Sequence, residues 1–351
     1  MKVDYIVVGC GIAGINFCEE LIANNKTFLV FDNKSQQAST VAGGLYNPVT
    51  LKRFTPVWNS KEQLEIALPV YSKIEKRLNK KIDFKIPVFR RFTSLEEQND
   101  WFAASDKVGL SDYMSTTIHK NDNEYIDAKF GFGEVLHTGR IDTKLLISEY
   151  KNYLQTNQLL IEETFEYDAI ERTEEFVVYK NYKAKHIVFA EGFGVINNPF
   201  FNYLPLVGSK GELLTIHSPN LKLEFVLKSS VFVIPLGNDL YRIGSTYNWK
   251  DKTNKTTPEA REELLNKFKT FTSCDFEVVN QVAGIRPTVQ NRRPLAGTHN
   301  TFNNYHVLNG LGTRGVMIGP YVAKQLYDFI ENKKPLDVVI DIKRFNKTIK
   351  T

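Results

Sequence analysis

The sequence predicts an α/β fold in which a parallel-sheet domain is interrupted by an α+β domain built on a mixed, largely antiparallel sheet. Three observations predict it. An apolar run near the N-terminus breaks directly into the glycine string VVGCGIAG, and a helix pattern, a second apolar run and an acid follow in that order. Between residues 206 and 285, stretches of period-two alternation such as GELLTIHS and VFVIPLG lie between α/β segments, which indicates an inserted antiparallel sheet.

Length and composition agree with two domains in one globular chain. With 351 residues, the chain is longer than one core comfortably holds, and its 42% hydrophobic and 24% charged residues exclude disordered and collagen-like classes. The net charge of +5 permits a nucleic-acid partner without requiring one. Cys10, Cys18 and Cys274 form no C-x-x-C pair and no disulfide framework, which favours a reducing cytoplasm. No stretch approaches 18 apolar residues, so we expect no membrane span.

The first unit has the context that a dinucleotide site requires. Residues 4–8 read as a strand buried on both faces, residues 15–25 as a helix, and KTFLVFD as a second strand ending at Asp32. The G-x-G-x-x-G match is weak evidence by itself. Together with this order of strand, glycine turn, helix, strand and acid, it indicates a dinucleotide-binding site.

Each residue of that motif has a physical role. Gly9 allows the tight turn, Gly11 lets the backbone approach a pyrophosphate, and Gly14 lets the helix pack closely on the strand. Asp32 would accept hydrogen bonds from both ribose hydroxyls and repel a 2′-phosphate, which disfavours NADP.

Further elements follow along the chain. A loop with paired Gly43 and Gly44 is expected to pass close to a flat ligand. GRIDTKLLISEYKNYLQTN is expected to form a helix opened by Asp142, and LYRIGSTYNW a strand. The remaining expected elements are a helix at 62–79, a strand at 85–92, a helix at 95–108, strands at 175–181 and 184–194, and a strand, glycine turn and helix over 305–334.

Four segments in order resemble the D-amino-acid oxidase (DAO) superfamily of FAD-dependent oxidoreductases, which includes glycine and sarcosine oxidases. They are VVGCGIAG with Asp32, STVAGGL, HIVFAEGFG, and GIRPTVQNRRPLAG followed by LNGLGTRGVMIGP. The resemblance implies a Rossmann-like FAD-binding domain of the glutathione-reductase-like (GR2) type, made of residues 1–80, 139–205 and 286–351. The inserted substrate-binding domain would comprise residues 81–138 and 206–285.

The cofactor that the resemblance implies is FAD. Its binding would be non-covalent, since the STVAGGL loop offers no Cys or His as a tether. The residues that the resemblance assigns to FAD are Gly9, Gly11, Ile12, Ala13, Gly14, Asp32, Asn33, Ser39, Thr40, Gly43, Gly44, Leu45, Ala190, Gly192, Gly312, Thr313, Arg314, Gly315 and Val316.

The reaction that the resemblance implies is oxidation of a carboxylate-bearing secondary amine or amino acid. Hydride would pass from the carbon next to the nitrogen to flavin N5, and water would hydrolyse the imine. Arg286 matches a clamp for the substrate carboxylate and Arg314 a second arginine, although either could be a structural ion-pair partner. Phe232 replaces a tyrosine of the glycine oxidase pattern, which leaves Tyr241 and Tyr247 as candidates for the missing hydroxyl.

Two other functions remain open. The segments NRRPLAG and LNGLGTRGVMIGPYVAKQL are also similar to the oxidase domain of the bifunctional tRNA methylaminomethyl-thiouridine biosynthesis protein, which would make tRNA a partner. The basic pairs Lys52-Arg53, Arg90-Arg91 and Arg292-Arg293 and the basic tail would then contact phosphates. The chain could also bind FAD without turning over an amine. No metal site is expected, because His137, His186 and His306 have no metal-ligand spacing.

Overall fold

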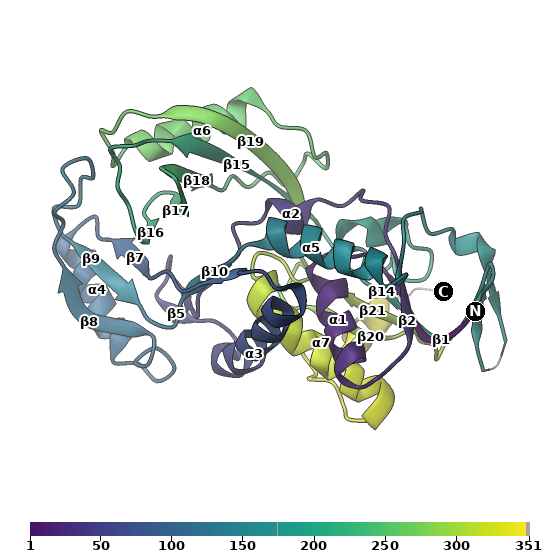
Figure 1. The fold of residues 1–351 in the computed structure, drawn as a ribbon. Helices are drawn as coiled ribbons and strands as arrows, with labels where there is room; N and C mark the ends of the chain where they lie inside the picture. The colour runs from purple at the N-terminus through teal and green to yellow at the C-terminus, as the bar shows by residue number, and fades with distance from the viewer. Residues whose placement is uncertain (174, 349–351) are drawn as a thin grey trace.

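The strands gather mainly in two sheets that lie side by side (Figure 1). The computed structural model describes residues 1–173 and 175–348, and residues 349–351 of the basic tail lie outside that range. All strands of the first sheet come from residues 2–31, 160–189 and 295–309, and all strands of the second from residues 88–135 and 209–286. The chain therefore passes back and forth between the two sheets.

The first sheet has a parallel centre in the order β11, β2, β1, β14 and β21. Its β-branched runs are buried on both faces: Val7 packs into one apolar cluster and Ile6 into another, and both side chains are 0% exposed. An antiparallel hairpin, β12 with β13, extends the β14 edge, and β20 pairs antiparallel to β21. The strands are β1 (Lys2–Val8), β2 (Phe28–Phe31), β11 (Leu160–Ile161), β12 (Ile170–Arg172), β13 (Val177–Tyr179), β14 (Tyr182–Phe189), β20 (Leu295–Thr298) and β21 (Tyr305–Asn309).

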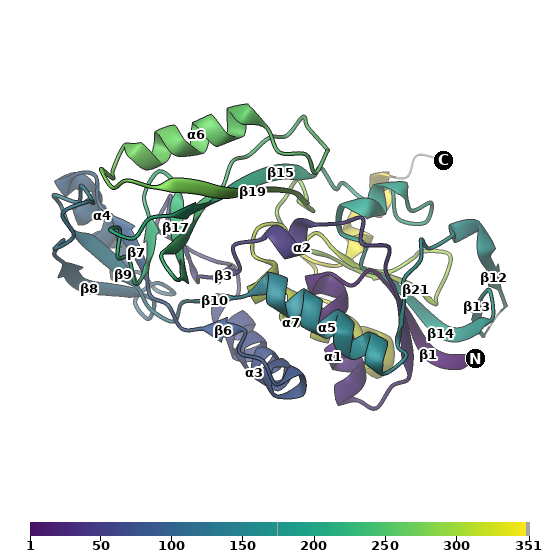
Figure 2. The same ribbon diagram turned by 45° about the horizontal axis from the view of Figure 1, so that its top comes forward.

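Four helices pack together beside the first sheet (Figure 2). They are α1 (Ile12–Ala23), α3 (Ser60–Leu78), α5 (Thr143–Thr156) and α7 (Gly315–Asn332). The Asp142 carboxylate caps α5 by accepting from Leu145 N, as its position in the sequence predicts. The helix predicted from residue 139 is wrong in its first turn, because Gly139–Ile141 form β10 between β3 (Leu45–Tyr46) and β6 (Asp83–Phe84).

The second sheet runs in the order β19, β15, β18, β17, β16, β7, β9 and β8. Its pairs are antiparallel except β16 with β7. The strands are β7 (Val88–Arg91), β8 (Met114–His119), β9 (Phe132–Val135), β15 (Ser209–His217), β16 (Val226–Lys228), β17 (Phe232–Gly237), β18 (Leu240–Gly244) and β19 (Glu277–Arg286).

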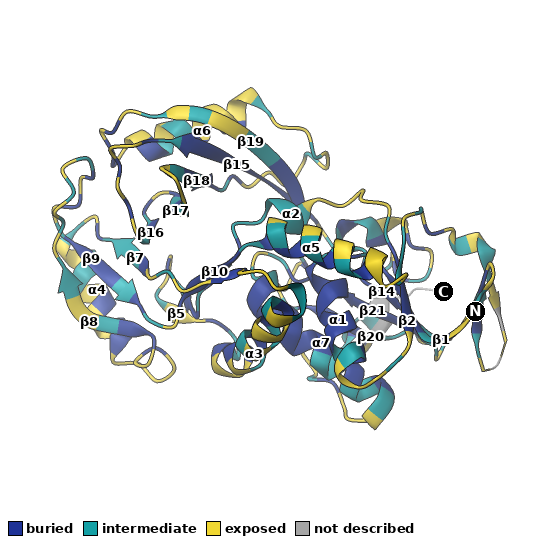
Figure 3. Ribbon diagram, in the orientation of Figure 1, coloured by how far each residue is buried: buried dark blue, intermediate teal, exposed yellow. Residues whose placement is uncertain are grey.

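Alternation along these strands separates a core face from a face that turns toward the first sheet. Leu214 and Ile216 pack with Leu264 of α6 (Pro258–Lys269), whereas Leu213 points to the opposite side. Helix α6 was not predicted from the sequence. Figure 3 shows buried residues along β15 and exposed residues on the outer side of α6.

The remaining elements are short. They are α2 (Ala38–Val41), α4 (Leu95–Ser105), the antiparallel pair β4 (Val49–Thr50) and β5 (Thr55–Pro56), and the 3-10 turns η1 (Tyr167–Ala169), η2 (Gly192–Asn197) and η3 (Ile342–Thr348). Within the described residues, none of the helices combines the length and the apolarity needed to cross a membrane.

Candidate cofactor and substrate site

One long cavity of about 1450 Å³ has walls from both sheets. Gly9 and Asp32 line one end, at the carboxyl ends of β1 and β2, and Phe232 and Arg286 of the second sheet line another part. Single small-ligand pockets usually hold roughly 300–1,000 Å³. This cavity therefore has room for a dinucleotide and a second ligand.

The glycine turn brings backbone close to backbone at the first end. Gly9 has φ +102°, and a Cβ there would lie 2.5 Å from the carbonyl oxygen of Ala190. A Cβ on Gly14 would lie 1.9 Å from the carbonyl oxygen of Gly9. Helix α1 has no side-chain cap at Gly11, although Ser39 Oγ accepts from Ile12 N at 3.1 Å. The other amides of the first turn are thus left for an anion.

Asp32 stands at the end of β2 with its carboxylate fixed. Its Oδ2 accepts from Cys10 N at 2.7 Å, and its Oδ1 accepts from Lys34 N and from Lys151 Nζ, both at 2.8 Å. Each carboxylate oxygen has two lone pairs, so Oδ2 keeps capacity for a ribose hydroxyl. Lys151 lies on α5, far along the chain, and nothing in the sequence pattern indicated this ion pair.

The paired glycines after α2 are explained by protein contacts as well as by the cavity that they line. A Cβ on Gly44, whose φ is +73°, would lie 1.9 Å from the carbonyl oxygen of Ile141 in β10. A Cβ on Gly43 would lie 2.9 Å from Cδ1 of Ile234 in β17. The loop therefore lies tightly between β10 and the second sheet. These protein contacts explain glycine at both positions, in addition to the expected passage of the loop close to a flat ligand.

A second helix N-terminus opens into the same cavity. Helix α7 begins after Arg314, has no side-chain cap and carries no acidic residue in its first turn. Gly312 lies just before it with φ +58°, and a Cβ on Gly312 would point into open space. The free amides and positive end of the helix favour negative charge at this point of the wall.

Glu191, between Ala190 and Gly192, is partly buried and lines the cavity near the glycine turn. Burial raises its pKa to about 6, although Asn198 Nδ2 and the Tyr167 hydroxyl both donate to the carboxylate and oppose the rise.

Arg286 and Arg314 come together beside Tyr247. The Arg286 guanidinium carbon lies 4.5 Å from the centroid of the Tyr247 ring, and its Nη2 donates to Ser245 Oγ at 2.6 Å. Arg314 donates to Asn47 O at 2.8 Å and to Thr50 Oγ1 at 3.2 Å. Burial lowers the pKa of both guanidinium groups, and within the described chain neither has a carboxylate at ion-pair distance. Two partly buried cations without a counter-ion in the described chain make this part of the wall suited to an anion.

Of the two tyrosines that the sequence offers here, only Tyr247 lines the cavity. Tyr241 was a wrong candidate, because it is buried among Ile243 and Leu264 on the opposite face of β18 and accepts from Leu223 N. Successive side chains of a β-strand point to opposite faces of the sheet, and Tyr241 lies on the face that packs into the core. Phe232 does line the cavity, on β17 opposite Gly244.

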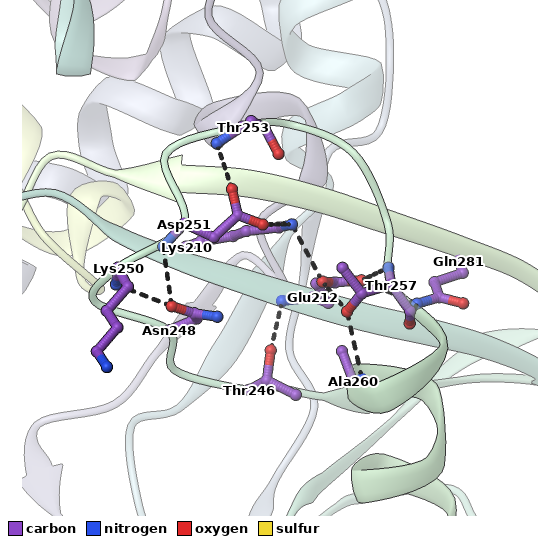
Figure 4. Close-up of polar contacts among 10 residues, drawn as sticks. All are labelled: Lys210, Glu212, Thr246, Asn248, Lys250, Asp251, Thr253, Thr257, Ala260 and Gln281. Atoms are coloured by element: carbon purple, nitrogen blue, oxygen red, sulfur yellow. Dashed lines mark hydrogen bonds and ion pairs between the residues drawn. The ribbon is translucent and has the colours of Figure 1, made fainter.

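A buried ion cluster holds the loop that carries Ser245 and Tyr247 (Figure 4). Lys210 Nζ, on a side chain 1% exposed, lies 3.3 Å from Glu212 Oε1 and 2.5 Å from Asp251 Oδ2. The Glu212 carboxylate also accepts from the amide and hydroxyl of Thr257. The strand predicted through Trp249 ends at Gly244 as a regular strand, although Asn248 still pairs with Lys210 of β15 in an isolated antiparallel bridge. The sequence did not indicate the cluster.

The cavity lining includes every residue that the sequence assigned to cofactor or substrate except Gly14, which packs against the turn, and Tyr241, which lies in the core. It also includes Lys52, Arg90, Arg292 and Arg293, which the sequence offered only as phosphate contacts for tRNA, and five side chains that were not assigned to the site: Trp58, Lys151, Lys228, Trp249 and Lys267. Within residues 1–173 and 175–348, no group of three or more His, Cys, Asp or Glu is placed to hold a metal ion.

A parallel sheet with a glycine turn at its strand ends, and two uncapped helix N-termini facing one cavity, define a dinucleotide-binding protein of the α/β class. The family model for DAO, FAD dependent oxidoreductase, matches residues 4–329. The chain therefore belongs to this family, and its cofactor is FAD. The glycine cradle and the uncapped helix ends fit that cofactor.

Similar proteins include glycine oxidase of Bacillus subtilis (strain 168), which is 22% identical over 64% of this chain and 65% of its own length. The tRNA 5-methylaminomethyl-2-thiouridine biosynthesis bifunctional protein MnmC of Shewanella halifaxensis (strain HAW-EB4) is 25% identical over 40% of this chain and 28% of its own length. The solved structure of glycine oxidase from Geobacillus kaustophilus superposes with a TM-score of 0.79 at 18% identity, covering 100% of this chain and 99% of that one. The chain shares the fold of that structure.

Proposed function

We propose that the protein oxidises the carbon–nitrogen bond of a carboxylate-bearing amine. The observation that carries the proposal is the pair Arg286 and Arg314, partly buried near Tyr247 without a carboxylate partner in the described chain. Glycine oxidase, a similar protein, is named for a substrate of this kind. Bound FAD would supply the chemistry by accepting hydride from the carbon next to the nitrogen, leaving an imine that water hydrolyses.

The work of this chain's residues is binding and orientation. Gly9, Gly11 and the first turn of α1 would hold the pyrophosphate, and Asp32 the adenosine ribose, non-covalently. The N-terminus of α7 at Gly315 would place positive potential near the ring system. The Arg286 guanidinium, held by Ser245 and by the Tyr247 ring face, would bind the substrate carboxylate.

A second candidate is oxidation of a modified wobble uridine in tRNA. It is favoured by the similarity to the bifunctional tRNA-modifying protein and by the cavity position of Lys52, Arg90, Arg292 and Arg293, drawn from three of the basic pairs. These side chains would contact phosphates around an inserted base.

Anaerobic mixing of the FAD-loaded protein with N-alkyl glycines, D-amino acids and hypomodified tRNA tests these functions. Bleaching of the flavin absorption band by N-alkyl glycines or D-amino acids supports the main proposal, and bleaching by tRNA alone supports the second. If FAD is bound and no amine bleaches it, the chain is an FAD-binding protein without amine turnover and both proposals fail.

A further inference from the structure

A row of side chains along the cavity wall connects the arginine site to a cluster of cations. In the register of the second sheet, Gly244 stands opposite Phe232, Phe232 opposite Lys228, and Lys228 beside Arg90 of β7. Residues paired in this way share one face of a sheet. All four line the cavity.

The distance along this row follows from strand spacing. Neighbouring strands lie about 4.8 Å apart, so Lys228 stands roughly 10 Å from Gly244, two strands away. Gly244 precedes Ser245, whose hydroxyl accepts from Arg286. The cation cluster therefore begins about two strand spacings beyond the carboxylate clamp, with the Phe232 ring between them and the Lys228 ammonium 4.8 Å from the centre of that ring.

The charges around Lys228 are unbalanced. No carboxylate in residues 1–173 or 175–348 forms an ion pair with its ammonium, and its charged neighbours are Arg90, Lys267 and Lys52. Burial first, and these three cations second, lower the pKa of Lys228 to about 8. Glu97 balances Arg90 and Glu263 balances Lys267, so two positive charges of the cluster remain without a partner. Like charges held together in a partly buried wall are unfavourable unless an anion joins them.

The chemistry of the cluster selects the anion. The Nε and Nη2 groups of Arg90 already bind Glu97, so its planar fork is not free to grip a carboxylate. The free groups are lysine ammoniums, which act as point charges with three donors each and suit phosphate. A phosphate monoester carries about −1.5 to −2 charges at pH 7, which matches the two positive charges left over.

We propose that the amine substrate carries a phosphate at the far end of its nitrogen substituent, bound by Lys228 and Lys52, with the paired cations Arg90 and Lys267 beside them. This rests on the proposed function, because it places the carboxylate of the same molecule at Arg286. The side chain of Phe232 would pack against the linker between the two anionic ends. The phosphate belongs either to a small phosphorylated amine or to a nucleotide of an RNA.

The first test is kinetic. N-(carboxymethyl)aminoalkyl phosphates with short and long linkers are compared with the matching alcohols, and the phosphate is expected to lower KM by about tenfold or more at the linker length that fits. In Lys228→Met the ratio of the two KM values should fall close to one, and in Lys228→Gln it should do the same. Lys61→Met, on the exposed side of α3 outside the cavity, is the matched control and should keep the wild-type ratio. Equal KM values for phosphates and alcohols in the wild type would overturn the proposal.

The second test does not depend on turnover. Inorganic phosphate is titrated calorimetrically into the FAD-loaded wild type, Lys228→Met and Lys61→Met, with FAD content and circular dichroism confirming that each is folded. Binding that Lys228→Met loses and Lys61→Met keeps supports the phosphate site, even if no amine reduces the flavin and the proposed function fails. Flavin reduction by carboxylated amines without such binding sinks the phosphate site alone.

The source of the phosphate is decided by competition. A small phosphorylated amine that displaces inorganic phosphate far better than an anticodon stem-loop oligoribonucleotide assigns the site to a small substrate. The reverse order, with an affinity that falls steeply as salt rises, assigns it to RNA.

Discussion

The guanidinium of Arg286 lies over the face of the Tyr247 ring, with its central carbon 4.5 Å from the ring centroid. The same guanidinium rests on Gly211 of β15, where a Cβ would lie 1.8 Å from Nη2. An aromatic face on one side and a bare backbone on the other fix the plane of the guanidinium, and Ser209 O, Ser245 Oγ and Thr246 O accept from its Nη groups.

Arg286→Leu should raise the KM for a carboxylated amine by about thirtyfold or more, because loss of one partner of a buried charge pair costs about 2 kcal/mol or more. FAD affinity, measured by flavin fluorescence, should stay within about twofold of the wild type because Arg286 belongs to the second sheet. Gly211→Ala should move KM in the same direction by displacing the intact guanidinium. Parallel losses of FAD and substrate binding would contradict the role assigned to Arg286.

Gly14→Ala should weaken FAD binding and lower the free energy of unfolding by about 1–3 kcal/mol, the usual cost of overpacking. Its new methyl would meet the Gly9 carbonyl at 1.9 Å and push α1 away from the turn. Gly194→Ala is the matched control, since its Cβ would meet only Gln36 and Glu191 at 3.4 Å or more. Urea unfolding of the apoprotein and flavin titration measure both effects, and tolerance of Gly14→Ala would remove the packing explanation for this glycine.

The glycine turn, α1, β2 and Asp32 were predictable because each depends on residues close together in the sequence. The motif fixes the turn, the apolar run fixes the strand, and the acid follows at the end of the next strand. Arg286 and Arg314 were found through the resemblance of the GIRP and GTRG segments to a family, and Tyr247 as a candidate for the hydroxyl missing at Phe232, whereas the stacking of Arg286 on the Tyr247 ring comes from the fold.

What the sequence could not supply is strand order and parity. Lys228 meets Arg90 only because β16 pairs with β7, an association of segments far apart in the chain. Tyr241 was mistaken for a site residue because the alternation in LYRIG does not reveal which face of the strand packs into the core. The structure shows that the face of Tyr241 does, since Tyr241 is buried with Ile243 and Leu264. The pairing of Lys210 with Asp251 is equally non-local.

Lys210→Met should lower the free energy of unfolding by about 3–5 kcal/mol, because it leaves the carboxylate of Glu212, 3% exposed, without its buried cation. Adding Glu212→Gln should recover part of that loss, since the amide keeps a hydrogen-bond acceptor for Thr257. Lys34→Met, which breaks an ion pair to Glu162 between side chains 59% and 35% exposed, should cost at most about 1 kcal/mol.

The same variant separates loop positioning from simple stability. At a temperature where Lys210→Met is fully folded, the KM for a carboxylated amine should rise while FAD affinity is kept, because the loop carrying Ser245 and Tyr247 loses its anchor. Unchanged KM in folded Lys210→Met would show that the cluster stabilises the domain without positioning Arg286.

The histidine pair between β14 and β21 should make the fold sensitive to acid. His186 Nδ1 lies 3.0 Å from His306 Nε2, and burial lowers the pKa of His186 to about 4 and that of His306 well below its ordinary value. Because the folded-state pKa is lower than the unfolded value of about 6.5, the unfolded chain binds the proton first. The contribution of the neutral histidine pair to the free energy of unfolding is therefore fully present above about pH 6.5 and is lost as the pH falls toward 4.

Glu191 works in the opposite direction, so the test compares two proteins at each pH. Its pKa is raised to about 6, above the unfolded value, and the folded state gains from its protonation as the pH falls. Between pH 8 and pH 5, the wild type should lose about 2 kcal/mol more unfolding free energy than His186→Gln, whose amide can still hydrogen-bond to His306 while carrying no proton. Urea titrations at the two pH values measure this difference, in which the Glu191 contribution cancels. An identical pH dependence in both proteins would show that His186 titrates alike in the folded and unfolded chain.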